Sequence, residues 1–246
     1  MKPTAYQAKR LILPGAVLSL LLLASNATAV DPKPIATVNA DELTADTQSS
    51  ITRNTKSGQQ ISIVWWIPIE FWQVALAQSA SLPVDTRNAI LNGMQDYMVI
   101  AVVVADVSQL GSFSFHERSR IEKTMRVTYK PPKRDERRLT PTRSVGGRVE
   151  EMLQGLKPVL ANSMGAMGEN FQLFVFEDKI KRVDARRVDP YSEGRLTVEI
   201  DATEKVTSVF ETPLNSLFVP RTCPNGKPAH LSWKFCPWSG AKLDDV

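Results

Sequence analysis

The sequence predicts an α+β fold with a mainly antiparallel sheet, packed by two or three helices. An uninterrupted apolar run at residues 97–105 is typical of a central strand covered on both faces. Apolar residues between Val149 and Leu160 recur at three- and four-residue steps, as on one face of a helix. The order strand, helices, strands, helix and strands favours this class over a doubly wound fold.

The elements before the central strand can be placed from residue types. A strand is predicted over residues 61–67, where β-branched and aromatic residues end at Pro68. A helix is expected over residues 69–80, and a second is expected to begin near Pro83 and to reach Met94. One strand and two helices should therefore precede the central strand.

The elements after the central strand are predicted less sharply. Residues 112–129 have spacing that fits further strands, and residues 130–147 form a charged connection with prolines. Pro158 lies inside the long helical pattern and is expected to kink it or to begin a new helix. The remaining strands are predicted at residues 171–176, 195–200 and 206–210.

The N-terminal segment, residues 1–29, has the pattern of a secretory signal peptide. A basic start is followed by an apolar run from Leu11 to Ala24 and by the small-residue site Ala27-Thr28-Ala29. We expect cleavage after Ala29 and a periplasmic or secreted protein. The run is shorter than the ~20 apolar residues of a bilayer span, so no stable membrane span is expected after cleavage. An uncleaved membrane anchor is the alternative.

The charge of the chain changes with this processing. The whole sequence holds 30 basic and 26 acidic residues, a formal net charge of +4. The signal peptide holds three basic residues and no acidic one, so that its removal leaves +1. A nearly neutral chain lacks the basic excess of nucleic-acid-binding proteins, and no nucleic-acid partner is expected.

After the signal peptide, the chain is predicted to have three parts. Residues 30–60 are polar without sustained periodicity, so they are expected to form a flexible leader. Order is expected to begin at Ile61 and to continue as one α+β domain over residues 61–220. Residues 221–246 form a tail with a motif of its own.

The tail has two similar short motifs, Cys-Pro-Asn-Gly from Cys223 and Cys-Pro-Trp-Ser-Gly from Cys236. It resembles a zinc ribbon, in which two knuckles of the form CPxCG supply four sulfurs to one zinc ion. Each knuckle here keeps its first cysteine and lacks its second, and Ser239 stands at one missing position. A structural zinc site needs four donors, so the resemblance is to a degenerate ribbon without its metal, and no cofactor is expected.

The same resemblance implies a role for the remaining cysteines. The two knuckles of a ribbon face each other across the metal, and an oxidising compartment favours disulfides. We therefore expect a disulfide between Cys223 and Cys236. The alternative is a metal-binding or redox site that uses Cys223, His230 and Cys236, with Asp244 or Asp245 as a further ligand.

The start of the predicted domain and the end of the chain also carry a wider likeness. The WWIPxEFW-like run from Trp65 and the FCPWSG ending are similar to those of a family of exported bacterial proteins. That resemblance implies export and no particular activity. The sequence has no GxSxG, HExxH, P-loop or GxGxxG motif, and its only histidines are His116 and His230. We therefore expect a non-enzymatic protein with a protein partner in the cell envelope.

Two further interpretations concern the aromatic group near residue 70. Trp65, Trp66 and Trp72 could form an aromatic surface, but neighbouring strand residues point to opposite faces, which favours core packing.

Glu70 could serve a hydrolase-type reaction if burial raised its pKa. Exposure of Glu70 in a cleft beside a second acid would favour that reaction, whereas burial on a core face would exclude it.

The strongest basic cluster offers an anion-binding alternative. Its members are Lys133, Arg134, Arg137 and Arg138. Such a cluster can bind phosphate or acidic polysaccharide, although Asp135 and Glu136 lie among these residues and weaken the local positive potential. A solvated loop is the simpler interpretation.

Overall fold

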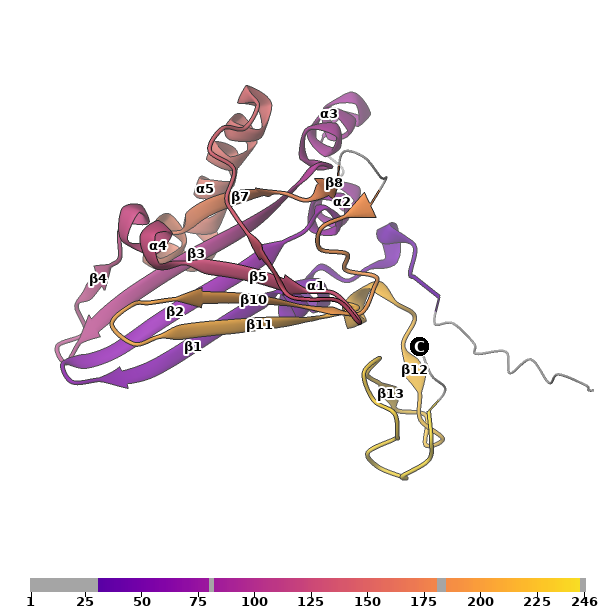
Figure 1. Cartoon of the computed structure of the whole chain (residues 1–246). Helices are drawn as coiled ribbons and strands as arrows, with labels where there is room; N and C mark the ends of the chain where they lie inside the picture. Colours follow the sequence, from indigo (N-terminus) through magenta and orange to yellow (C-terminus); the bar gives the residue numbers. More distant parts are fainter. Residues whose placement is uncertain (1–30, 80–81, 181–184, 244–246) are drawn as a thin grey trace, which may run out of the picture.

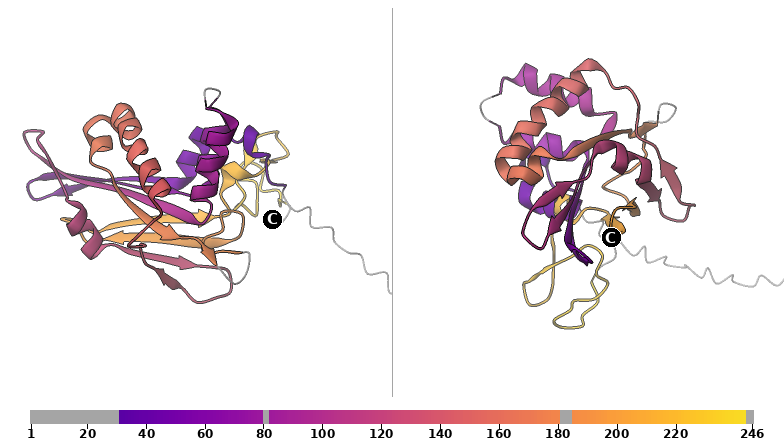
Figure 2. Two further views of the ribbon diagram at one scale, coloured as in Figure 1. Left: turned by 90° about the horizontal axis from the view of Figure 1, so that it is seen from above. Right: turned by 90° about the vertical axis from the view of Figure 1, so that its left-hand side faces the viewer.

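The structure is a computed structural model that describes residues 31–79, 82–180 and 185–243. These residues form three layers: helices, a five-stranded sheet and a four-stranded sheet (Figures 1 and 2). All pairings between the named strands are antiparallel, and helices and strands are segregated, which confirms the predicted α+β class. The predicted signal peptide lies outside the described residues.

The five-stranded sheet is built around β3. Its strands are β1 (Gln48–Thr55), β2 (Gly58–Ile67), β3 (Tyr97–Ser108), β4 (Phe113–Phe115) and β7 (Gln172–Glu177). β2 pairs along one side of β3, while β7 and β4 pair with successive parts of its other side. The β3 residues from Met98 to Ala105 are all buried, which confirms the predicted central strand.

The four-stranded sheet packs against one face of the larger sheet. Its order is β11 (Val206–Thr212), β10 (Gly194–Ile200), β5 (Arg126–Lys130) and β6 (Arg137–Leu139). Side chains of β11 alternate between buried and exposed, as expected for a strand with one face on a core. The layer between the sheets contains Trp66 and Phe210, whose ring centroids lie 6.2 Å apart.

Helices cover the other face of the five-stranded sheet. They are α2 (Ile69–Ala77), α3 (Val84–Met94) and α5 (Gly147–Glu169) (Figure 2). Together with the sheet they enclose a second core. The alternation of β2 sends Trp65 into this layer, where Trp72 of α2 is also buried. Both faces of the sheet are therefore covered, which explains the continuous apolar run of β3.

Helix α5 breaks at a different residue from the one predicted. The helix continues through Pro158, which lies on its exposed side, and becomes non-helical at Gly165, with φ 54° and ψ −136°. Glycine adopts this conformation without the steric cost that other residues have. The following turn packs closely on the helix, because a Cβ added at Gly168 would lie 1.9 Å from the carbonyl oxygen of Leu160.

The prediction of a flexible leader at residues 30–60 is wrong for its described part. This segment contains the 3-10 helix η1 (Ile35–Thr37), helix α1 (Ala40–Thr47), strand β1 and the start of β2. The Asn39 side chain caps α1 by accepting hydrogen bonds from two backbone N–H groups, and Leu43 is fully buried. β1 is an edge strand with no fully buried side chain, so its sequence stays polar although its backbone is paired with β2. The ordered domain therefore begins well before Ile61.

Several short elements were not predicted. Helix α4 (Arg118–Thr124) interrupts the region expected to hold only strands, and β6 lies within the predicted connection. The remaining short elements are β8 (Lys179–Ile180), β9 (Ala185–Arg186), the 3-10 helix η2 (Asn215–Leu217), β12 (Arg221–Thr222) and β13 (Pro228–Ala229). In the part of the chain that the structure describes, no helix has the length and apolarity to cross a membrane.

Candidate interaction surface

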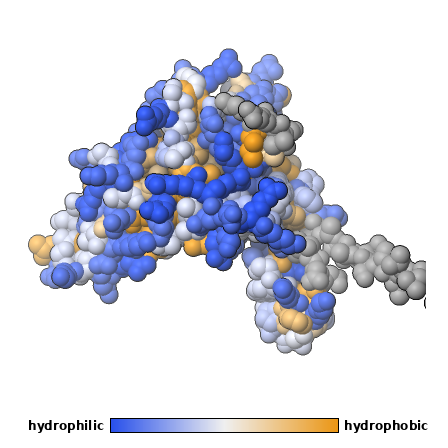
Figure 3. All heavy atoms as spheres, viewed as in Figure 1, coloured by the Kyte–Doolittle hydropathy of each residue, from blue (hydrophilic) through white to orange (hydrophobic). Residues whose placement is uncertain are grey.

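The described tail, residues 221–243, forms a small lobe that stands out from the body (Figures 1 and 3). It consists of the β12–β13 hairpin and two tight turns. In each turn, the glycine N–H donates a hydrogen bond of 2.8 Å to the cysteine carbonyl: Gly226 to Cys223, and Gly240 to Cys236. Both glycines have positive φ angles, 78° and 69°, which explains why glycine ends each turn.

The predicted disulfide between Cys223 and Cys236 is confirmed. It joins the two turns, with the Cα atoms 5.7 Å apart, and both cysteines are buried in a core that also contains Ala229 and Leu243. The alternative metal site needs free sulfurs, whereas both are bonded to each other, and Nδ1 of His230 lies 2.9 Å from Oγ of Ser232. Its further candidate ligands, Asp244 and Asp245, lie outside the described residues. Among the residues 31–79, 82–180 and 185–243, no three His, Cys, Asp or Glu side chains form a group that could hold a metal ion.

One arginine holds the loop of the tail in place. Nη2 of Arg221 donates to the backbone carbonyls of His230, Leu231 and Trp233 at 2.8, 2.6 and 2.6 Å. Leu231 then connects the lobe to the body: its side chain is buried in the core between the sheets, and its N–H donates to the side chain of Asn215. The lobe is therefore fixed both internally and at its base.

Three aromatic side chains of the tail remain exposed. Trp233, Phe235 and Trp238, called here the tail aromatics, are 37%, 58% and 48% exposed. The rings of Trp233 and Trp238 contact edge to face, with centroids 5.8 Å apart, and the ammonium of Lys227 lies 4.9 Å from the centroid of the Trp238 ring. Between residues 221 and 243 the sequence has four basic residues and no acidic one. The lobe therefore presents an aromatic and cationic surface.

A cleft separates this lobe from the body. It has a volume of about 790 Å³ and is lined by the 130–133 loop, by parts of β10 and β11, and by residues 230–232 of the tail. Its charges are mixed, since its lining contains Lys130 and Lys133 as well as Glu193 and the exposed ion pair of Arg195 with Glu211. The cleft thus lacks the uniform charge of an anion site.

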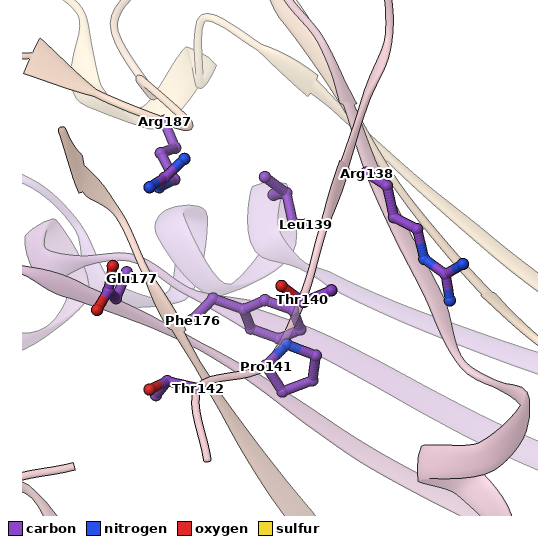
Figure 4. Close-up of a pocket in the computed structure, with 8 residues that line it drawn as sticks. All are labelled: Arg138, Leu139, Thr140, Pro141, Thr142, Phe176, Glu177 and Arg187. Carbon is purple, nitrogen blue, oxygen red and sulfur yellow. The ribbon is translucent and has the colours of Figure 1, made fainter. Parts of the chain in front are cut away.

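The predicted anion-binding cluster does not converge on one site. Arg137 lies over the Tyr129 ring and donates to the carbonyl of Arg187, whereas Lys133 lines the cleft beside the tail. Arg138 lines a different cavity of about 200 Å³, where its guanidinium points away from Arg187 (Figure 4). Adjacent residues of a strand point to opposite sides, which separates Arg137 from Arg138. Arg134 is exposed in the loop before β6.

The aromatic surface considered for Trp65, Trp66 and Trp72 does not exist. Their exposed fractions are 7%, 0% and 8%, because β2 directs the first two into different cores and α2 packs the third against the sheet. The indole N–H of Trp65 donates to Oγ1 of Thr47 at 3.2 Å. These tryptophans therefore stabilise the two core layers.

Glu70 is buried in an ion-pair network rather than exposed in a cleft. It is 4% exposed, and its Oε1 lies 2.5 Å from Nη1 of Arg186. Nε of the same Arg186 lies 2.7 Å from Oδ2 of Asp178, whose other oxygen accepts a hydrogen bond from the Val188 N–H. This network, called here the Arg186 network, joins α2 to β9 and to the end of β7. Glu70 is thus not exposed in a cleft, which was the arrangement expected for a hydrolase-type role.

The charge balance of the network affects the pKa of Glu70. Burial raises the pKa of the Glu70 carboxyl above 4.5, and the positive charge of Arg186 only partly offsets this effect. The native state therefore binds this proton more tightly than the unfolded chain does. The contribution of Glu70 to the free energy of unfolding is largest at low pH, and it falls as pH rises from about 4.5 through the native pKa.

We expect the variant Glu70→Gln to lose this part of the pH dependence. Urea titrations at several pH values above 4.5 should show a free energy of unfolding that falls less steeply with pH for Glu70→Gln than for the wild type. The comparison of slopes is independent of any constant loss of stability caused by the substitution. Parallel curves for the two proteins would show that Glu70 titrates as it does in the unfolded chain.

Comparisons of the chain with models of protein families, with curated proteins and with solved structures find no match. The exposure of the tail aromatics was not predicted from the sequence. One sequence feature could have predicted this exposure: Trp233, Phe235 and Trp238 lie in a segment too short to bury them. The pairing of Arg186 with Glu70 could not be predicted in this way, because the two residues lie 116 positions apart in the sequence.

Proposed function

We propose that this protein is exported, is not an enzyme, and acts by binding a partner in the cell envelope through its tail. The observation that carries the proposal is the exposure of Trp233, Phe235 and Trp238 on a lobe closed by a disulfide. Aromatic residues are enriched at binding interfaces and supply most of the affinity at their centres.

The size of the tail explains why these side chains stay exposed. Its own core contains four buried residues, Cys223, Ala229, Cys236 and Leu243. That core cannot enclose two indoles and a phenyl ring, and clustered apolar surface on a protein is typical of an interaction site. A partner that covers the tail aromatics removes this surface from water, which favours association.

The tail is also held rigid before any partner binds. The disulfide closes the loop between its two turns, and Arg221 fixes the loop carbonyls on the other side. Less conformational entropy is therefore lost when the tail aromatics meet a partner. An oxidising compartment, as implied by the signal-peptide pattern, maintains the disulfide.

The proposal can be tested by crosslinking in living cells. A photoreactive amino acid placed at Phe235 is expected to crosslink an envelope component, whereas one at Leu110 is expected not to. Leu110 is a suitable control because it is 95% exposed and lies in the β3–β4 turn at the opposite end of the molecule (Figure 1). The double variant Trp233→Ala, Trp238→Ala should lower crosslinking from position 235 by about 30-fold, the loss typical of a central aromatic contact. Equal crosslinking from both positions would contradict the proposal.

A further inference from the structure

We propose that the tail binds the surface of an anionic lipid membrane, with the tail aromatics at the level of the headgroups and Lys227 and Lys234 facing their phosphates. This inference rests on the proposed function and specifies the chemistry of the partner. It is carried by two independent features of the structure, the composition of the exposed tail surface and the position of the N-terminal end of the described chain.

The exposed side chains of the tail match a membrane interface. Tryptophan rings favour the headgroup region, because one end of the indole is apolar and the other donates a hydrogen bond. Lysine side chains extend from such a position toward the phosphates. Lys227 and Lys234 are exposed beside the tail aromatics, and the tail has no acidic residue up to position 243. Asp244 and Asp245 follow in the sequence and oppose this attraction.

The N-terminal end of the described chain lies at the base of the same lobe. The backbone N–H of Val219 donates to the carbonyl of Asp31 at 3.0 Å, and that of Lys33 donates to the carbonyl of Leu217 at 2.7 Å. Pro32 and Phe218 form a bridge between these bonds. Residue 31 is therefore fixed next to the point where the chain enters the tail.

This placement relates the tail to the predicted export segment. The apolar run of that segment ends at Ala24, seven residues before Asp31, and seven extended residues span at most about 25 Å. Once the domain has folded, an export segment that is still uncleaved, or that is retained as an anchor, would hold the end that carries the tail near the membrane. Val219, 49% exposed at the base of the lobe, adds apolar surface at this end.

The geometry of the two indoles favours a lipid surface over a sugar. A sugar site pairs an open aromatic face with polar side chains that fix the hydroxyl groups. Here Trp233 and Trp238 lie at 70° to each other, and the Lys227 ammonium occupies one face of Trp238. A membrane interface, in contrast, requires neither an open aromatic face nor polar side chains that accept hydrogen bonds from sugar hydroxyl groups.

The tryptophans supply a specific readout for a binding experiment. The chain has five, of which Trp65, Trp66 and Trp72 are buried, so only Trp233 and Trp238 can be reached from outside. Brominated phosphatidylcholine vesicles, with and without phosphatidylglycerol, are mixed with the full chain as it is recovered after export. We expect quenching of the exposed tryptophans only when phosphatidylglycerol is present. The predicted signal peptide has no tryptophan, so it does not contribute to this signal.

Matched variants test whether the tail, and not another part of the surface, binds the vesicles. Lys227→Gln with Lys234→Gln should weaken binding to phosphatidylglycerol vesicles by about 30-fold, on the scale known for basic residues at anionic membranes. Phe235→Ala should weaken it by about 10-fold through the loss of buried apolar area. The control Leu110→Ala with Phe113→Ala removes exposed apolar side chains at the opposite end and should bind as the wild type does.

The outcomes distinguish this inference from the proposed function. Absence of quenching together with crosslinking of an envelope protein from position 235 would overturn the membrane inference and leave the proposed function standing. Absence of both would overturn both. Quenching that is independent of phosphatidylglycerol, or equal loss in the Leu110 control, would contradict the inference. A dimer in ultracentrifugation that Trp233→Ala disperses would replace the membrane with a second copy of this chain.

Discussion

Replacing Arg186 with alanine is expected to lower the free energy of unfolding by about 3–5 kcal/mol at neutral pH. Its guanidinium is the shared partner of Glu70 and Asp178, whose side chains are 5% and 1% exposed. Without it, both carboxylates stay buried, and no other basic side chain of the described residues forms an ion pair with either of them. Removal of one partner from a buried ion pair has a large cost for this reason, even where the intact pair adds little net stability.

Two comparisons show whether charge causes this loss. The matched control Arg138→Ala removes an exposed arginine that lines a surface cavity, and its effect should stay within about 0.5 kcal/mol. The loss in Arg186→Ala should also shrink at acidic pH, because burial raises the pKa of Glu70, so that this carboxyl takes up a proton and is buried in neutral form. Both variants are measured by urea denaturation. A loss in Arg186→Ala that is equal at all pH values would point to packing instead of charge.

The variant Cys223→Ser is expected to release the tail while leaving the body folded. Closure of a loop of about 15 residues contributes roughly 3 kcal/mol in the chain-entropy model, and the cysteines here are 13 residues apart. The tail core is too small to replace that contribution. Local opening should then be roughly 100-fold more frequent, which is seen as faster proteolysis within residues 221–243.

The control for this variant is Ser239→Ala in the second turn. Ser239 is exposed and its hydroxyl makes one long hydrogen bond, 3.4 Å, so its loss should leave proteolysis of the tail unchanged. Reduction of the wild-type disulfide should give the same cleavage rate as Cys223→Ser. Equal cleavage rates for oxidised wild type and Cys223→Ser would show that the lobe is held together without its disulfide.

The layers of the fold could be predicted where burial dictates the sequence. The β3 run is apolar throughout because both faces are covered, and the α5 pattern is periodic because only one face is buried. β1 could not be identified in this way. It is an edge strand whose stability comes from backbone pairing, and backbone hydrogen bonds leave no mark on side-chain composition.

The candidate site was predictable only in part. The Cys223–Cys236 disulfide was expected from the resemblance of the tail to a ribbon and from the predicted export, and the structure contains it. The exposure of Trp233 and Trp238 was not expected, because aromatic residues in a sequence are more often buried than exposed. The Arg186 network joins residues from distant parts of the chain, and only the tertiary fold brings them together.

We propose that the closed tail is the binding surface of this protein. Its most direct test is photo-crosslinking from position 235 in exporting cells, for the wild type and for Cys223→Ser at matched protein levels. We predict that a crosslinked species forms from the wild type and is lost from Cys223→Ser, while no species forms from position 110 in either protein. An undiminished crosslink in Cys223→Ser would contradict the claim, because binding would then not require the shape that the disulfide maintains.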